Sequence, residues 1–349
     1  MFFKRKKAVN PPTREPAPSL LAAPGSLPEP PMLYSDAAPL LVVRFYPSAL
    51  LDFDELRTLP LGMGSLNTPG KSMTESIFCG LAVDVGSAYA RVTAQVMDTW
   101  NVDIDTAFDQ AVTNCLNHQW ATLRIAGVSH IVNDELLVPT LWLRPDIALS
   151  MVATQEEPTE SGKLIMVALT RSEAFLAWDN DLEGCSYIAE QCQAAFDREV
   201  TIESVMPSRW TGTTWETVNW EELGVSHAVA QNLEVRYNMV CYSRQKLALD
   251  AWFESQSEIY VVATYIGFAT KDGQVLSMAS VICDDLQINV IPRTDFVLFV
   301  YPNAAKQFNV PWDLAQTVLG DSLEPLGRIP EVYKVTEVPA LETLQNLSD

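Results

Sequence analysis

The chain has 349 residues, 48% of them apolar and 19% charged, which is the composition of a globular protein with a sizeable core, and its length favours two domains. A formal net charge of −21 disfavours nucleic-acid partners and anionic lipid, because both carry phosphates that an acidic surface repels. The apolar runs are too short and interrupted to cross a bilayer, so we expect no transmembrane segment.

Residues 1–35 are predicted to form a disordered arm that is basic at its start and rich in proline afterwards. The arm opens with an aromatic and basic tip: Phe2, Phe3, Lys4, Arg5, Lys6 and Lys7. No apolar segment of the signal-peptide kind follows this tip, so we expect no export. The tip alone would give only weak membrane contact.

Residues 36–206 are predicted to form a first α+β module. Apolar and β-branched runs predict strands over 40–46, 77–83 and 89–92. Helices are expected over 93–100 and 103–116, the second of them with apolar residues at helical spacing.

The clearest helical pattern lies near the end of this module. Cys185, Ile188, Ala189 and Cys192 share one apolar face, which predicts a helix packed on a sheet. The six cysteines form no CxxC pair and have no histidine at metal-ligand spacing. We therefore expect reduced core cysteines in a cytoplasmic protein, with no metal and no cofactor.

Residues 207–340 are predicted to form a second α+β module, followed by a polar tail at 341–349. Its expected elements are a short helix over 225–233, strands over 258–268 and 274–283 that form a hairpin, and a helix behind Pro311.

A sequence echo links the two modules. Residues 167–178 and 289–300 both read as an apolar strand, an arginine, a hydroxyl residue, an acid and a second apolar strand. The echo predicts two related modules, each a mostly antiparallel sheet with helices packed on one face.

Residues about 77–206 resemble the YtpQ-like family of uncharacterised bacterial proteins. The resemblance rests on the runs Leu81 to Asp84, Tyr89 to Val92, Ala111 to Asn114 and Val200 to Val205. The family's Pro-His pair is replaced here by Thr170 and Arg171. The resemblance implies a bacterial domain of unknown function, and it brings no activity, cofactor or catalytic residue.

Two features suggest an interaction surface. Arg171 and Arg293 could offer their guanidinium groups to carboxylates of a partner, or their acidic neighbours could pair with them within a strand-to-strand turn. The second feature is a trio between the modules, Trp210, Trp215 and Trp220. This trio could form an exposed recognition strip, or it could cement the modules together.

We see no set of residues that would make an active site. His118 and His130 have no nucleophile in a recognisable motif beside them, and the acid pairs Asp179/Asp181 and Asp284/Asp285 lack the ligand spacing of a calcium loop. The favoured hypothesis is a non-catalytic module that binds another protein. It is compared with immunity proteins and chaperones by analogy only. The alternative is an enzyme, such as a hydrolase, whose Asp and Glu residues only the fold brings together. Oligomeric state stays open.

Overall fold

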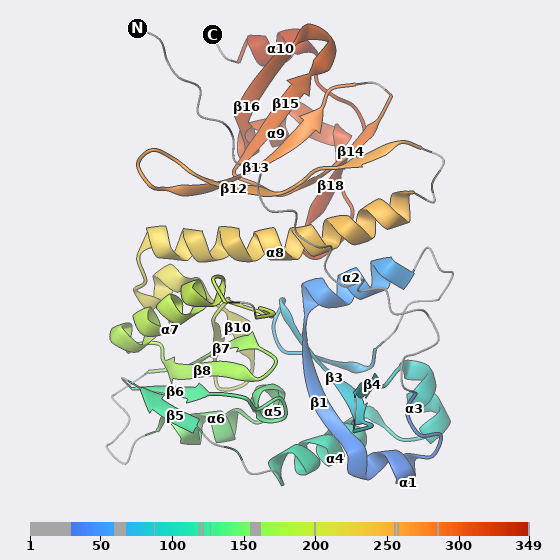
Figure 1. Cartoon of the computed structure of the whole chain (residues 1–349), viewed down its shortest axis with the longest axis vertical. Helices are drawn as coiled ribbons and strands as arrows, with labels where there is room; N and C mark the ends of the chain where they lie inside the picture. The colour runs from blue at the N-terminus through green and yellow to red at the C-terminus, as the bar shows by residue number, and fades with distance from the viewer. Residues whose placement is uncertain are drawn as a thin grey trace, which may run out of the picture.

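The computed structural model describes residues 29–58, 68–86, 88–117, 120, 122–125, 127–153, 162–198, 200–254, 256, 258–284 and 286–347. These ranges form helices together with antiparallel and mixed sheets, so the predicted α+β class is confirmed. Figure 1 shows three tiers: two sheets with their helices below, the long helix α8 (His227–Phe253) across the middle, and two further sheets above.

The described part of the chain starts inside the region predicted as a disordered arm, and the end of that arm is ordered. Helix α1 (Tyr34–Ala37) buries Ala37, and the ring of Tyr34 lies 5.8 Å from that of Trp100. The Trp100 indole N–H also donates to the Pro31 carbonyl at 2.9 Å. These contacts fix the chain from about Pro31, whereas the basic tip at residues 2–7 lies outside the described residues.

Sheet A is built from the strands predicted near the start of the fold. Its order is β1 (Leu41–Pro47), β3 (Ile77–Asp84) and β2 (Gly70–Ser72), with β4 (Tyr89–Arg91) also paired to β3. All seven residues of β1 are buried, because Leu41, Val43 and Phe45 face the main lower core while Val42 packs against Cys115 on the other side. A strand covered on both faces reads as a continuous apolar run, as this one does.

Both helices predicted after sheet A are present, as α3 (Ala94–Trp100) and α4 (Ile104–Leu116), while α2 (Ser48–Thr58) lies between β1 and β2. Helix α4 begins where the Asp103 carboxylate accepts a hydrogen bond from the Thr106 N–H at 2.8 Å. This N-cap satisfies a backbone donor that has no partner within the helix.

Sheet B lies beside sheet A and has six strands. Its order is β10 (Trp215–Thr217), β9 (Ser208–Trp210), β7 (Leu164–Thr170), β8 (Glu173–Trp178), β6 (Val128–Ile131) and β5 (Thr122–Ile125). Helices α5 (Leu137–Leu143) and α6 (Pro145–Val152) contribute to the core on one face, and α7 (Leu182–Ala195) covers the other. The predicted helix face of Cys185, Ile188 and Cys192 is buried on the sheet. All six cysteines are free and buried, as expected.

The boundary predicted at 206/207 is wrong, because strands β9 and β10 lie beyond it and extend sheet B. Strand β9 pairs directly with β7, and β10 pairs with β9. The helix predicted over 225–233 is only the first part of α8, which runs for 27 residues. Leu233 and Tyr237 of α8 pack into the core below, whereas Val235, Tyr242 and Leu249 belong to a cluster with the tier above.

The upper tier holds two four-stranded sheets. Sheet C has the order β11 (Tyr260–Val262), β14 (Ile288–Pro292), β18 (Val332–Val335) and β17 (Leu323–Pro325). Sheet D has the order β12 (Ile266–Ala269), β13 (Val275–Ile282), β15 (Phe296–Tyr301) and β16 (Lys306–Pro311). Strands β12 and β13 form a hairpin as predicted, but the strand predicted over 258–268 is divided between β11 in sheet C and β12 in sheet D. Helix α9 (Trp312–Leu319) follows Pro311 as predicted.

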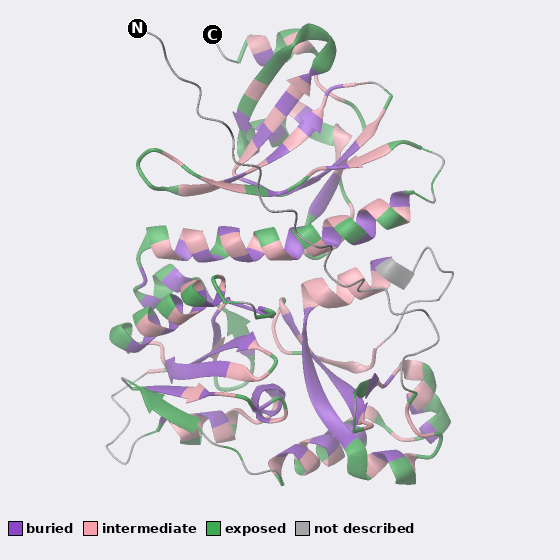
Figure 2. Ribbon diagram, viewed as in Figure 1, coloured by how far each residue is buried: buried purple, intermediate pink, exposed green. Residues whose placement is uncertain are grey.

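A shared core joins the sheets of the upper tier. Val281 and Phe299 of sheet D and Ile291 and Val335 of sheet C are buried in one cluster. The segment predicted as a polar tail contributes to it, because α10 (Leu341–Gln345) places Leu344 in this core. Figure 2 shows buried residues running through the strands of both sheets.

The sequence echo does not mark a structural repeat. Strands β7 and β8 pair with each other as a hairpin, whereas β14 and β15 belong to different sheets. The reason lies at Asp295, whose carboxylate accepts hydrogen bonds from the backbone N–H and hydroxyl of Ser277 on β13, each at 2.7 Å. These bonds direct the chain into sheet D directly after Pro292 has paired with Val332 in sheet C.

Candidate functional site: a groove at the end of sheet C

One end of sheet C, where strands start or finish, brings three distant segments together. Strand β11 runs parallel to β14, and β14 runs antiparallel to β18, so the start of β11, the start of β14 and the end of β18 meet. The Ile288 N–H donates to the Ile259 carbonyl at 2.9 Å, and the Thr336 N–H donates to the Ser322 carbonyl at 2.9 Å. The backbone around this end is therefore held by the sheet and by its neighbouring turn.

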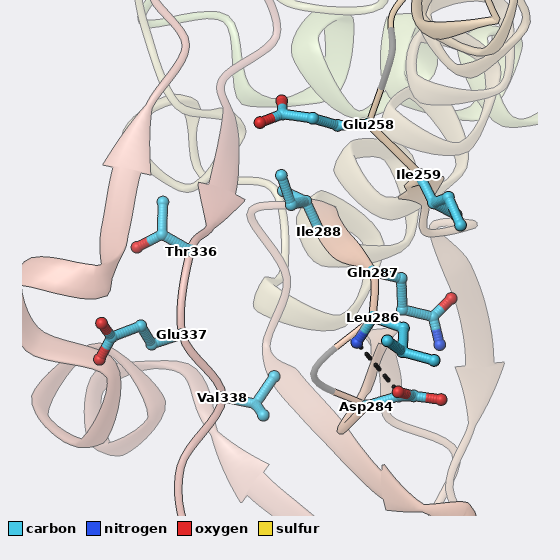
Figure 3. Close-up of a pocket in the computed structure, with 9 residues that line it drawn as sticks. All are labelled: Glu258, Ile259, Asp284, Leu286, Gln287, Ile288, Thr336, Glu337 and Val338. Carbon is cyan, nitrogen blue, oxygen red and sulfur yellow. Dashed lines mark hydrogen bonds between the residues drawn. The ribbon is translucent and has the colours of Figure 1, made fainter.

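These segments line a groove with a volume of about 650 Å³. Its lining residues, drawn in Figure 3, are Glu258, Ile259, Asp284, Leu286, Gln287, Ile288, Thr336, Glu337 and Val338. Leu286 is 79% exposed and Ile259 is 65% exposed, whereas Ile288 and Val338 are half-buried. Large apolar side chains this exposed and close together are typical of a binding surface.

Three carboxylates surround the apolar residues, and the nine described lining residues include no lysine or arginine. In Figure 3 Glu258 lies beyond one end of Ile288, Glu337 lies on the β18 side, and Asp284 lies beside Leu286. Asp284 accepts a hydrogen bond from the Leu286 N–H at 3.0 Å, which orients the loop that presents Leu286. The Tyr260 hydroxyl donates to Glu258 at 2.6 Å, and this bond raises the pKa of Tyr260 to about 12.

Chemically, the groove can accept a ligand that is cationic and partly apolar. Carboxylates at its rim attract ammonium or guanidinium groups, and the exposed Leu286 and Ile259 offer apolar contact. Throughout the described ranges, no three His, Cys, Asp or Glu side chains gather as a metal site would require. The same ranges contain no helix long and apolar enough to span a membrane.

The tryptophan trio does not form an exposed strip, so that prediction is wrong. Trp220 is 2% exposed and its indole N–H donates to the Val205 carbonyl at 3.0 Å. Trp215 is 6% exposed and donates to the Trp142 carbonyl at 3.0 Å, while the half-buried Trp210 packs against it with ring centroids 5.5 Å apart. The three indoles hold the lower tier together and do not join two modules.

The two arginines of the echo have separate surroundings. Arg171 donates through Nε to Glu203 at 2.8 Å, and the Glu203 side chain is only 1% exposed. The turn acid beside Arg171 is therefore not its partner. In the second segment of the echo, Arg293 lies near Glu234. Desolvation raises the pKa of Glu234, and the Arg293 guanidinium opposes this shift. Arg171 and Arg293 follow strands of different sheets and do not form one surface.

His130 lies in a side-chain cluster that sequence spacing did not reveal. Its Nε2 lies 3.0 Å from Glu173 and its ring stacks on Phe175 at 4.2 Å. The hydrogen bond with His130 and the charge of Arg198 lower the pKa of Glu173, although its burial opposes them. The cluster lies at the start of β8, where Glu173 is the first residue, and it explains His130 as a structural partner of Glu173. His118 lies outside the described residues.

The acid pairs also have local roles. Asp181 accepts a hydrogen bond from the Gly184 N–H at 2.9 Å and so caps α7, while Asp179 accepts one from the Lys163 N–H at 2.8 Å. Asp284 belongs to the groove, and Asp285 lies outside the described residues. Of the groove residues, sequence reasoning noted only Asp284, because the others come from three segments spread over 80 residues. The sequence shows a leucine that follows two acids, but only the structure shows that Leu286 is exposed.

Comparison with known proteins gives no guide to this groove: no family model, curated protein or solved structure matches the chain.

Proposed function

We propose that this protein is a non-catalytic binding protein and that the groove of sheet C takes a basic, partly apolar segment of another protein. One observation carries the proposal: Leu286 and Ile259, 79% and 65% exposed, lie in a groove whose charged lining residues are all acidic. A basic segment with an apolar side chain would satisfy both features, since its charges meet the rim and its side chain covers the leucine.

We propose that the protein acts in a bacterial cytoplasm. We also propose that residues about 77–206 are related to the YtpQ-like family, which they resemble in sequence. Six free cysteines, none of them in a disulfide, support a reducing compartment, because disulfides are common in proteins of oxidising compartments and rare in the cytosol. The strongly acidic body supports a basic protein partner over nucleic acid.

The expected affinity is modest. Covering one apolar side chain stabilises a complex by about 2 kcal/mol, and an exposed charge pair contributes under about 1 kcal/mol. With two exposed apolar residues and three carboxylates in the groove, we expect a dissociation constant on the order of 0.1 mM for a short peptide. Added salt should weaken binding because it screens the rim charges.

The test is titration calorimetry with a short peptide of alternating lysine and leucine, and with its counterpart in which glutamate replaces lysine. We expect the full chain to bind the first peptide and not the second. Leu286→Ser should reduce the affinity at least about tenfold, the loss of roughly one apolar contact. Leu247→Ser is the matched control, because Leu247 is 68% exposed on α8 and does not line the groove.

The acidic rim has its own variant and control. Glu258→Gln combined with Glu337→Gln should weaken the lysine peptide and flatten its salt dependence. Glu75→Gln, at an exposed position of the lower tier, should change neither. Equal affinity for the two peptides, or an unchanged affinity in Leu286→Ser, would contradict the proposed site.

A further inference from the structure

The charge of this chain is unevenly distributed along its sequence. Four of its 23 basic residues are Lys4, Arg5, Lys6 and Lys7, and the other 342 positions carry 44 acidic residues against 19 basic ones. Phe2 and Phe3 precede the four cations. Residues 1–7 are therefore a basic and partly apolar segment of the same chemistry as the ligand that suits the groove.

The chain between this segment and the fold is long enough to reach the groove. The described structure is anchored near Pro31, whose carbonyl accepts the indole N–H of Trp100 at the end of α3. Figure 1 shows α3 on the side of α8 opposite the strands β14 and β18 of sheet C. Residues 8–28 provide 21 residues, which span at most about 70 Å. A folded chain of this size has a radius of gyration of about 20 Å, which corresponds to a sphere roughly 50 Å across, so the extended segment is longer than the molecule is wide.

We propose that residues 1–7 occupy the groove of sheet C in the same molecule, with an aromatic ring against Leu286 and Ile259 and the four cations facing Glu258, Asp284 and Glu337. This assignment rests on the proposed function of the groove and names its resident occupant. Charge complementarity favours the segment, because it holds the densest positive charge of the chain and the groove lining holds no cation to repel it.

The consequence is competition with any external partner. A tethered segment is presented at an effective concentration on the order of 1 mM. If a free peptide of the same residues binds with a dissociation constant of about 0.1 mM, residues 1–7 occupy the groove in about ten of every eleven molecules. An external basic segment then binds about tenfold more weakly to the intact chain, with a dissociation constant of about 1 mM, than to a chain whose own segment is disabled. The peptide affinities expected above for the groove and its variants therefore apply to the full-length chain that also carries Lys4→Gln, Arg5→Gln, Lys6→Gln and Lys7→Gln.

The experiment measures fluorescence anisotropy of a labelled peptide of residues 1–7 at low ionic strength, titrated with two full-length proteins. One is the natural chain, and the other carries Lys4→Gln, Arg5→Gln, Lys6→Gln and Lys7→Gln. We expect the second protein to bind the peptide about tenfold more tightly. Adding Leu286→Ser to it should abolish the gain, and adding Leu247→Ser should leave it intact.

The outcomes separate the two proposals. If both proteins bind the peptide equally and Leu286→Ser weakens both, the groove is a binding site and the docking of residues 1–7 is refuted. If neither protein binds this peptide or the lysine and leucine peptide, both proposals fail. A difference in peptide affinity between the two proteins that grows with protein concentration would mean that residues 1–7 dock on another copy of the chain. That result would overturn docking within one molecule.

A second measurement locates the contact. Carbodiimide joins an ammonium to a carboxylate in direct contact, so the natural chain should give crosslinks from Lys4, Lys6 or Lys7 to Glu258, Asp284 or Glu337. Crosslinks only to other acids would refute the assignment. Binding of the segment to anionic vesicles, with no difference between the two proteins toward the peptide, would assign residues 1–7 to a membrane instead.

Discussion

The pair of Arg171 and Glu203 offers the sharpest test of how this fold uses charge. The carboxylate of Glu203 is 1% exposed, and its Oε2 accepts no hydrogen bond from the described residues. Arg171 provides the charge that compensates it, from a side chain that is half exposed. Arg171→Met keeps the aliphatic part of the side chain and removes this charge, which leaves the carboxylate buried beside strand β7.

The expected loss follows from these exposures. Two opposite charges about 4 Å apart attract by about 4 kcal/mol at an effective dielectric constant of 20. Removing one partner of a buried pair costs about 3–5 kcal/mol, and water that replaces the half-exposed guanidinium returns part of this. We therefore expect Arg171→Met to lower the free energy of unfolding by about 3 kcal/mol. Adding Glu203→Gln should recover about half of the loss, because no charge is then left buried.

Urea denaturation followed by far-UV circular dichroism measures both variants. The matched control is Arg144→Met, whose pair with Asp146 is shorter, at 2.6 Å, but 41% and 61% exposed. Exposed pairs contribute under about 1 kcal/mol, so this variant should be nearly neutral. A loss below about 0.5 kcal/mol in Arg171→Met, or no recovery in the double variant, would refute the argument that the charge of Glu203 depends on Arg171.

Three further outcomes are expected. The pKa of Glu173 is lowered in the fold, so its contribution to stability is present at neutral pH and is lost as pH falls through that lowered value; unfolding of Glu173→Gln at a series of pH values below 5 should show a flatter dependence than that of the natural chain. Trp220→Phe removes the N–H that bonds the Val205 carbonyl and leaves a small void, so the urea midpoint should fall, corresponding to about 1–2 kcal/mol. Burial raises the pKa of all six cysteine thiols, so a thiol reagent at pH 8 should label none of them quickly in the native chain and six after denaturation.

The sequence was sufficient to predict a helix or strand when that element buries one face, or buries both faces evenly. Strand β1 and the helix face of Cys185 and Cys192 were predicted because their apolar residues keep one period. Helix α8 was not predicted beyond its start, because its buried residues point to opposite sides: Tyr237 faces the core below and Tyr242 the cluster above. Apolar positions spread around a helix leave no amphipathic stripe to detect.

The repeat predicted from the echo was wrong, and the groove was not predicted, for a different reason. Both depend on contacts between residues that are distant in the sequence. The same local pattern of arginine, hydroxyl residue and acid closes a hairpin at Ser172 but carries the chain between two sheets at Thr294. The deciding contact is Asp295 to Ser277, 18 residues earlier. The groove likewise needs the ends of β11, β14 and β18 at one end of sheet C, which no local period encodes.

Helix α8 also makes the groove depend on the whole chain. Strand β11 is fastened to it by Lys246, which donates to the Val262 carbonyl at 2.7 Å, and by the ring of Tyr260, stacked on Phe253 at 4.0 Å. The opposite side of the same helix is buried in the lower tier through Leu233 and Tyr237. A fragment that starts at residue 207 would expose that apolar side to water and lose the strand that β9 pairs with. The groove is thus positioned from both tiers, and its ligand is to be sought with the intact chain.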